Sequence, residues 1–277
     1  MPNLIDTTEA ETTLPPVADW MQNGFHAFLR PYLRRHFDAV AVAAGGRPDK
    51  PSVAPELSGG PLVVLTNHPS WWDPVVAHFL NRQLFPDRQF RAPIDAAALS
   101  QYQVFERLGF FGIDGTRRGA TNFLRTAAAV LESPADMLWI TPEGRFADVR
   151  DDAASLMPGL AHVCHRAGRG HAIALALEYV FWNERLPVCL AKFSSPIDLS
   201  LPRENKTVLL QEMTVTLRQT QRELSSGAIA RSFEPFDNLL VGKSGGGFVY
   251  DTFRRLRAIV TGGRFQARHE NLSGTDS

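Results

Sequence analysis

The segment Leu62–Pro74 has the sequence LVVLTNHPSWWDP. The apolar run Pro61–Leu65 predicts a buried β-strand, and the residues Val75–Leu84 predict a helix. A polar turn that follows a strand is where α/β folds commonly carry reactive side chains. This turn holds His68 and, after four further residues, Asp73.

His68 and Asp73 are the candidate catalytic pair. Histidine is the side chain best suited to accept a proton near neutral pH. A carboxylate that accepts a hydrogen bond from one imidazole nitrogen leaves the other nitrogen free as a base. A structural explanation is also open, because Asp73 before Pro74 is favourable helix-start chemistry. Ser70 is a rival nucleophile, although it lacks the Gly-x-Ser-x-Gly elbow.

Two glycine-containing segments follow further along the chain. Leu108–Arg117 has the sequence LGFFGIDGTR, and Thr141–Arg145 has the sequence TPEGR. With Asn67-His68-x-x-x-x-Asp73, they resemble, in order, the three motifs of the glycerolipid acyltransferase family, which includes the 1-acylglycerol-3-phosphate acyltransferases. The resemblance covers residues 62–188 and implies acyl transfer from a thioester to a hydroxyl, with His68 as general base and Asp73 orienting it.

The resemblance also implies a set of residues that hold the phosphate or glycerol part of the acceptor. These residues are Arg117, Glu143, Gly144 and Arg145, and further candidates are Arg118, Asn67 and Arg91. Guanidinium groups bind phosphate in a bidentate manner, which suits this role. From the residues alone, a solvated arginine turn and a surface ion pair explain the two segments equally well.

This sequence departs from the family pattern in its phosphate-binding part. No threonine separates Gly144 from Arg145, and Gly115-Thr116 separates Asp114 from Arg117. Pro93 stands near a position where the family commonly has lysine. These departures leave the proposed base intact but alter the part that would bind phosphate. Acyl transfer is therefore implied more firmly than an acceptor that carries phosphate, and lipid acceptors with another headgroup remain open.

The pattern along the chain favours an α/β fold with a mostly parallel central sheet flanked by helices. The predicted strands are 62–65, 89–92, 110–113, 137–140, 172–179 and 188–193. The predicted helices are 75–84, 96–108, 121–132, 156–167 and 205–224. All three motifs follow strand ends, and this is the edge where open α/β sheets bind ligands.

We expect a mobile tail over residues 1–16, an N-terminal helix or helical pair with a linker over 17–60, an α/β acyltransferase domain over 61–262, and a second tail over 263–277. The apolar spacing of Val17–Ala44 predicts a helix that Pro31 bends or splits. Its aromatic and arginine side chains suit either packing on the domain or a membrane interface. Phe248–Val260 is predicted to be a basic amphipathic helix. Gly242–Gly247 is predicted to be a flexible loop rather than a phosphate loop.

Composition excludes several classes of protein. The 29 Lys+Arg balance the 29 Asp+Glu, so no global basic field attracts nucleic acid. Cys164 and Cys189 show no metal-ligand spacing, and we expect two reduced thiols in a cytoplasmic protein. No secretory signal or membrane-spanning run is apparent, so any contact with the inner face of the cell membrane would be peripheral.

We expect no metal and no resident cofactor. Acyl-CoA or acyl-carrier protein would serve as co-substrate, with a lipid acceptor. Two other functions remain open: hydrolysis of acyl esters or thioesters with the same histidine, and a non-catalytic lipid-binding role.

Overall fold

A computed structural model of the chain describes residues 14, 16–57, 59–232 and 235–242. The strands are β1 (Ala39–Ala43), β2 (Leu62–Thr66), β3 (Gln89–Asp95), β4 (Phe110–Ile113), β5 (Asp136–Ile140), β6 (His171–Val180), β7 (Val188–Phe193), β8 (Ile197–Asp198) and β9 (Phe236–Val241). The helices are α1 (Asp19–His36), α2 (Ala54–Leu57), α3 (Asp73–Leu84), α4 (Ala96–Gln101), α5 (Val104–Arg107), α6 (Arg117–Glu132), α7 (Pro158–Ala167) and α8 (Lys206–Ala230).

The strands form one nine-stranded sheet in the order β4-β3-β5-β2-β6-β7-β1-β9, with β8 paired to β6. Neighbouring strands from β4 to β6 are parallel, as are β1 and β7, whereas β7 is antiparallel to β6 and β9 is antiparallel to β1. The mostly parallel sheet with flanking helices confirms the predicted fold class. Because the strands β2 to β6 alternate with helices, their carboxyl ends lie at one edge of the sheet.

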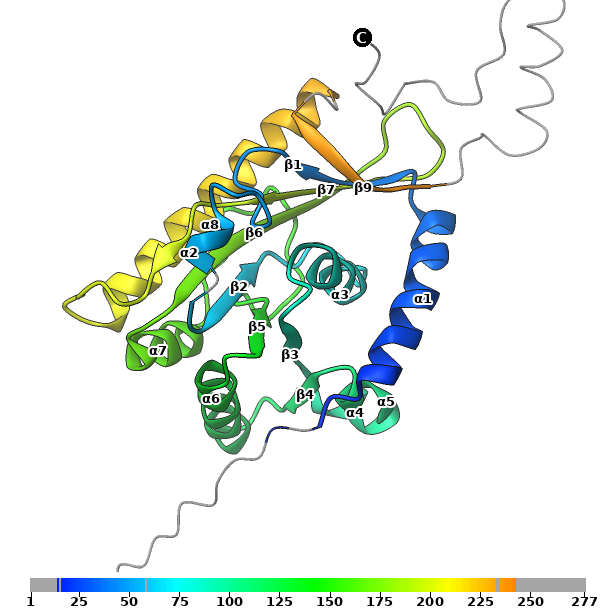
Figure 1. The fold of residues 1–277 in the computed structure, drawn as a ribbon. Coiled ribbons are helices and arrows are strands. Elements are labelled where there is room, and N and C mark those ends of the chain that lie inside the picture. Colours follow the sequence, from blue (N-terminus) through cyan, green and yellow to red (C-terminus); the bar gives the residue numbers. More distant parts are fainter. Residues whose placement is uncertain (1–13, 15, 58, 233–234, 243–277) are drawn as a thin grey trace, which may run out of the picture.

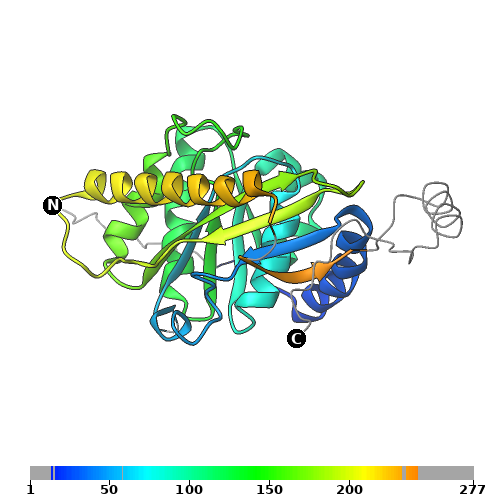
Figure 2. The same ribbon diagram turned by 90° about the horizontal axis from the view of Figure 1, so that it is seen from above.

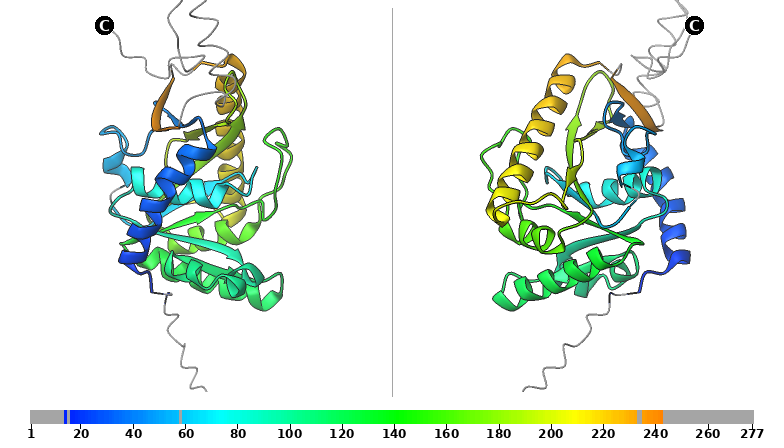
Figure 3. Two further views of the ribbon diagram at one scale, coloured as in Figure 1. Left: turned by 90° about the vertical axis from the view of Figure 1, so that its right-hand side faces the viewer. Right: turned by 60° about the vertical axis from the view of Figure 1, so that its left-hand side comes forward.

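Helices cover both faces of the sheet (Figure 1). On one face, Leu33 of α1 and Leu80 of α3 share an apolar cluster with Trp139 of β5. On the other face, α6, α7 and α8 bury a second cluster that includes Leu160 and Leu217. Two further views confirm that α1 and α8 lie on opposite sides (Figure 3). Seen from above, α8 runs along the sheet (Figure 2).

Strand β2 places the candidate turn in the middle of the sheet. All five of its residues are buried, as expected for a central parallel strand covered on both faces. Its neighbours are β5 and β6, which pair with it in parallel register. The turn after β2 therefore opens at the middle of the carboxyl edge.

The N-terminal prediction needs correction. The expected helix over 17–44 ends at His36, contains Pro31 without being split, and is followed by β1, which pairs with β7 and β9. The sequence AVAVA of β1 is buried throughout, so it lacks the polar alternation that marks a strand. The segment 17–60 thus supplies a strand to the sheet of the domain that follows.

Other predicted elements shift more modestly. The helix expected over 96–108 is two short helices, because the chain leaves α4 at Tyr102. The expected linker 45–60 contains α2, and the strands β8 and β9 were not predicted. The predictions for 1–13, 243–247, 248–260 and 263–277 lie outside the described residues.

Two composition-based points can be compared with the structure. Cys164 and Cys189 are both buried and free, as the sequence predicts. Within the described ranges, no helix combines the length and apolar composition that a membrane crossing requires.

Candidate active site

The turn between β2 and α3 is fixed to the neighbouring strand β6. The side chain of Asn67 donates from Nδ2 to the Leu177 carbonyl at 2.9 Å and accepts from the Leu177 N–H at 2.8 Å. Asn67 is 2% exposed, so both bonds are shielded from water. The asparagine therefore positions the backbone of the following residue, His68, rather than facing a ligand.

His68 and Asp73 form a hydrogen-bonded pair. Nδ1 of His68 lies 2.6 Å from Oδ2 of Asp73. The Asp73 side chain is 2% exposed and that of His68 is 18% exposed. Among the described residues, none forms a hydrogen bond or ion pair with Nε2 of His68. An imidazole held this way carries its proton on Nδ1 and can accept another at Nε2.

Asp73 receives two further hydrogen bonds. The Ser70 backbone N–H donates to Oδ2 at 3.0 Å, and the Tyr179 hydroxyl donates to Oδ1 at 2.6 Å. Burial raises the pKa of the Tyr179 phenol well above its usual value, with Cys189 and Asp73 adding to the rise. Tyr179 is therefore a stable donor, and the carboxylate is held on three sides. Asp73 is the first residue of α3, but its side chain serves this network rather than a helix cap.

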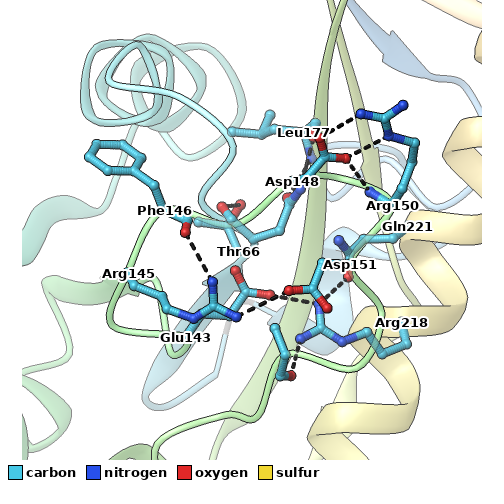
Figure 4. A network of polar contacts seen from close by, with 12 residues as sticks. Thr66, Glu143, Arg145, Phe146, Asp148, Arg150, Asp151, Leu177, Arg218 and Gln221 are labelled. Atoms are coloured by element: carbon cyan, nitrogen blue, oxygen red, sulfur yellow. Dashed lines mark hydrogen bonds and ion pairs between the residues drawn. The ribbon is translucent and has the colours of Figure 1, made fainter.

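The segment after β5 carries the third motif. Gly144 has φ +64°, a conformation that L side chains rarely adopt, and a Cβ there would strike the Met157 sulfur. Glu143 turns inward: its side chain is 1% exposed and Oε1 accepts from Nη1 of Arg218 at 2.6 Å (Figure 4). The buried atoms Glu143 Oε2 and Arg218 Nε find no partner in the described structure. The Glu143 carboxylate thus holds the turn from inside.

Arg218 joins the two ends of this segment. Besides Glu143, it donates from Nη1 to Gln221 at 2.6 Å and from Nη2 to the carbonyl of Ala154. It comes from α8, which packs against β6 and β7. The long loop between Glu143 and Ala154 is therefore closed by one buried guanidinium (Figure 4).

The predicted acceptor-binding arginines lie at the same sheet edge. Arg117 and Arg118 open α6 after the carboxyl end of β4, and both are exposed. Neither side chain makes a hydrogen bond or ion pair with another described residue. Arg145 is also exposed, but Nη2 donates to Asp151 at 3.1 Å, which neutralises part of its charge.

Arg91 does not approach the site. It is 7% exposed and Nε donates to Asp136 at 2.5 Å, at the start of β5. Its partner in the sheet register is Leu138, which pairs with Val63, five residues before His68. Arg91 thus lies toward the amino ends of the strands, in an ion pair with Asp136, and its contact with the acceptor stays a prediction.

Three residues near the pair escaped the prediction from sequence. Tyr179 ends an apolar strand with a polar group at the ligand-binding edge, which is a usable signal. Arg218 lies on a helix among inward-facing apolar residues, and its partner is 75 residues away. Phe146 stacks on His68 with ring centroids 4.2 Å apart, and the only signal for it is an aromatic residue in a polar loop.

A cavity of about 200 Å³ lies elsewhere, between α1, α3 and the start of β3. It contains His78, whose Nε2 donates to the Leu108 carbonyl at 2.8 Å. Burial lowers the pKa of His78 to about 3, so this imidazole is neutral. The cavity lies toward the amino ends of the strands and is separate from His68. No group of three or more His, Cys, Asp or Glu suited to a metal ion occurs in the part of the chain that the structure describes.

Comparisons with known proteins concern the fold and the family that the chain resembles. Residues 48–178 match the family described as Acyltransferase. The fold is similar to the crystal structure of the 1-acyl-sn-glycerophosphate (LPA) acyltransferase PlsC from Thermotoga maritima, with a TM-score of 0.51 and 14% identity over 74% of this chain and 80% of that chain. A search of curated proteins gave no match. The family match contains His68, Asp73, Arg117 and Glu143.

Proposed function

We propose that the chain, whose residues 48–178 match the family described as Acyltransferase, is an O-acyltransferase that moves a fatty acyl group from a thioester to a hydroxyl of a lysophospholipid or related lipid. The observation that carries the proposal is the His68–Asp73 pair with Nε2 of His68 left without a partner among the described residues. It lies inside the matched segment and at the carboxyl edge of the sheet.

The chemistry follows from the two ring nitrogens. Nδ1–H donates to Asp73, and Nε2 accepts the proton of the acceptor hydroxyl as its oxygen attacks the thioester carbonyl. The C–O bond forms, the C–S bond breaks, and the departing thiolate takes the proton from His68. Because a thiolate is a good leaving group, no covalent enzyme intermediate is needed. Positioned proton transfer typically contributes about 10²–10⁴-fold.

Arg117 and Arg118 are our candidates for the acceptor's headgroup. Strand β4 lies three positions from β2 in the sheet, which places α6 roughly 14 Å from the turn at about 4.8 Å per strand. Their exposed guanidinium groups can reach part of that distance toward an anionic headgroup. Arg145, already paired with Asp151, contributes less charge, and Glu143 and Gly144 shape the loop.

The proposed contact with a membrane rests mainly on α1. Trp20 is 71% exposed and Phe28 is 56% exposed, and Trp71 of the active-site turn is 60% exposed. Ring contacts run from Phe28 through Tyr32 and Trp72 to Trp71. Exposed aromatic residues beside arginines suit a peripheral contact with lipid headgroups. We propose that this surface brings the active-site turn to a membrane that supplies the acceptor.

The acyl donor in this proposal is acyl-CoA or acyl-carrier protein. Hydrolysis is the second candidate, because water could replace the acceptor at Nε2. A purely lipid-binding role is less consistent with the complete hydrogen-bond set of His68 and Asp73, since a site that performs no chemistry has no need of it.

The test compares wild type with His68→Ala. Purified protein is given a long-chain acyl-CoA with lysophospholipids, glycerol 3-phosphate or non-phosphorylated hydroxylated lipids, and the released thiol and new ester are measured. We expect ester formation that depends on both acceptor and His68. Retained ester formation in a folded His68→Ala variant would refute the general-base role, and free acid alone would favour hydrolysis. If acyl-CoA gives no reaction, acyl-carrier protein is tested as donor.

A further inference from the structure

The ring of Phe146 lies over the imidazole of His68. Their centroids are 4.2 Å apart and the ring planes are 29° apart, which is a stacked arrangement. Phe146 is nevertheless 59% exposed, so much of the ring has no protein neighbour. In Figure 4 its ring projects away from the polar network below it. A large apolar side chain held in this way at a reactive group calls for a functional explanation.

The backbone around Phe146 is tied to the base itself. The N–H of Ala147 donates to the carbonyl of His68 at 3.0 Å. Nη1 of Arg145 donates to the carbonyl of Phe146 at 3.3 Å. These bonds come from the residues on either side of Phe146, so they hold the backbone that carries the ring close to His68.

The loop is also held from the protein interior. Arg218 joins Glu143, three residues before Phe146, to the carbonyl of Ala154, eight residues after it. Both charged side chains are buried, at 5% and 1% exposed, so water competes little for this contact. The stacking of Phe146 on His68 is therefore set by anchors on both sides of the loop.

The ring restricts what reaches the base. The Nδ1 edge of His68 is occupied by Asp73, and Phe146 covers one face of the imidazole. We propose that Phe146 is a positioning residue that shields Nε2 of His68 from bulk water and so favours acyl transfer over hydrolysis. This inference rests on the proposed function, because it concerns the choice of nucleophile in the same reaction.

The two competing reactions differ only in the nucleophile. When a lipid hydroxyl attacks, its proton passes to Nε2, the C–O bond forms, the C–S bond breaks, and ester and thiol result. When water attacks, the same bonds change and the products are carboxylic acid and thiol. Thiol release is equal in both cases, so the ratio of free acid to ester is the quantity that reports shielding.

The experiment uses acyl-CoA labelled in the acyl chain together with the acceptor that wild type uses. Free acid and ester are separated and quantified for wild type, Phe146→Ala and Phe146→Leu. We expect the acid-to-ester ratio to rise about fivefold in Phe146→Ala, which corresponds to about 1 kcal/mol of barrier difference. Phe146→Leu, which keeps an apolar cover, should lie between the two. Ile229→Ala, which removes an apolar side chain that is 82% exposed on α8, should match wild type.

The outcomes separate the inference from the proposed function. If wild type makes no His68-dependent ester, the proposed function fails and the inference falls with it. If wild type makes ester and the ratio in folded Phe146→Ala is unchanged, the inference alone is refuted. Should Phe146→Ala fail to fold, Phe146→Leu decides by whether its ratio exceeds that of wild type.

A measurement without substrate adds a second readout. The C2 hydrogen of histidine exchanges slowly with deuterium, and the exchange of the neutral ring reports access of solvent. Peptide mass spectrometry follows His68 in wild type and Phe146→Ala. Faster exchange in the variant supports the shield, and equal exchange overturns it. A residue that only stabilised the loop would leave this exchange unchanged.

Discussion

Replacing Asp73 with asparagine removes one charge beside His68 and keeps the shape of the side chain. The orientation of the new amide follows from the structure. Oδ2 of Asp73 accepts from the Ser70 backbone N–H at 3.0 Å and from His68 Nδ1 at 2.6 Å, whereas Oδ1 faces the Tyr179 hydroxyl. The backbone N–H cannot rotate away, so the asparagine oxygen takes the Oδ2 position. The amide NH₂ then faces Tyr179, whose hydroxyl can turn to accept.

This orientation preserves the proton on Nδ1 of His68, so the free nitrogen is still a base. The variant loses only the charge that stabilises the imidazolium. A hydrogen bond to a charged group contributes about 1.5–3 kcal/mol, which corresponds to a decrease of about 10–150-fold in kcat/KM. In serine proteases the corresponding substitution reverses the tautomer and costs about 10⁴-fold in kcat. The structure predicts the smaller loss here.

The assay is ester formation under kcat/KM conditions for wild type and Asp73→Asn, with circular dichroism to confirm the fold. Asp87→Asn is the control, because Asp87 is an exposed carboxylate toward the amino ends of the strands. A loss near 10⁴-fold would refute the argument from the Ser70 N–H, since it would mean that the asparagine nitrogen faces His68. An unchanged rate would refute any participation of the Asp73 charge.

Three further predictions concern other parts of the molecule. Arg218→Met leaves the Glu143 carboxylate buried without its partner and should lower the free energy of unfolding by about 3–5 kcal/mol in urea titrations. His78 has its folded-state pKa lowered to about 3 by burial, so the unfolded chain binds more protons below its pKa of 6.5. The free energy of unfolding should therefore fall by about 2 kcal/mol between pH 7 and pH 5 on account of His78, and this part of the fall should vanish in His78→Gln. Replacing Trp20 and Phe28 together with alanine should weaken sedimentation with phosphatidylglycerol vesicles by about tenfold or more, because both rings lose apolar contact.

Each of these predictions has a matched comparison. The double variant Arg218→Met with Glu143→Gln should recover much of the lost stability, and an equally unstable double variant would contradict the ion-pair argument. His165→Gln, at an exposed histidine of α7, is the control substitution measured beside His78→Gln. Ile229→Ala should bind vesicles as wild type does, and equal binding by the α1 variant would remove α1 from the membrane contact.

The sequence predicted the sheet best where each strand is an apolar run bounded by polar turns. β1 shows where that reasoning fails. Its alanines favour helix by intrinsic propensity, and the strand forms because Ala39–Ala43 pairs with β7 and β9, which lie far along the chain. The hydrogen bonds that decide its structure come from residues 188–191 and 236–241, and no local pattern contains them.

The candidate site likewise combines contacts between residues close in the sequence, which could be predicted, and contacts between distant residues, which could not. His68 and Asp73 lie within one turn, so their spacing, together with the family resemblance, was enough to predict the contact between them. Tyr179 contacts Asp73 from 106 residues away, and Arg218 contacts Glu143 from 75 residues away. Such pairs are created by the packing of β6 and α8, so a single sequence gives no direct sign of them. Arg91 shows the converse limit of the sequence, since its residue type suits an anionic headgroup but the structure places it near the amino end of β3, paired with Asp136.

Strand β6 sets the distance between the base and its partner. Asn67, which precedes His68, is bonded to the backbone of Leu177, and Asp73 is bonded to the side chain of Tyr179. Leu177 and Tyr179 lie two residues apart on the same strand, so both ends of the turn are attached to one rigid element. The five-residue step from His68 to Asp73 could adopt many shapes if free. The two attachments to β6 select the one in which Nδ1 of His68 meets the carboxylate and Nε2 remains available to a substrate. The reactivity of the turn thus depends on a strand more than a hundred residues further along the chain.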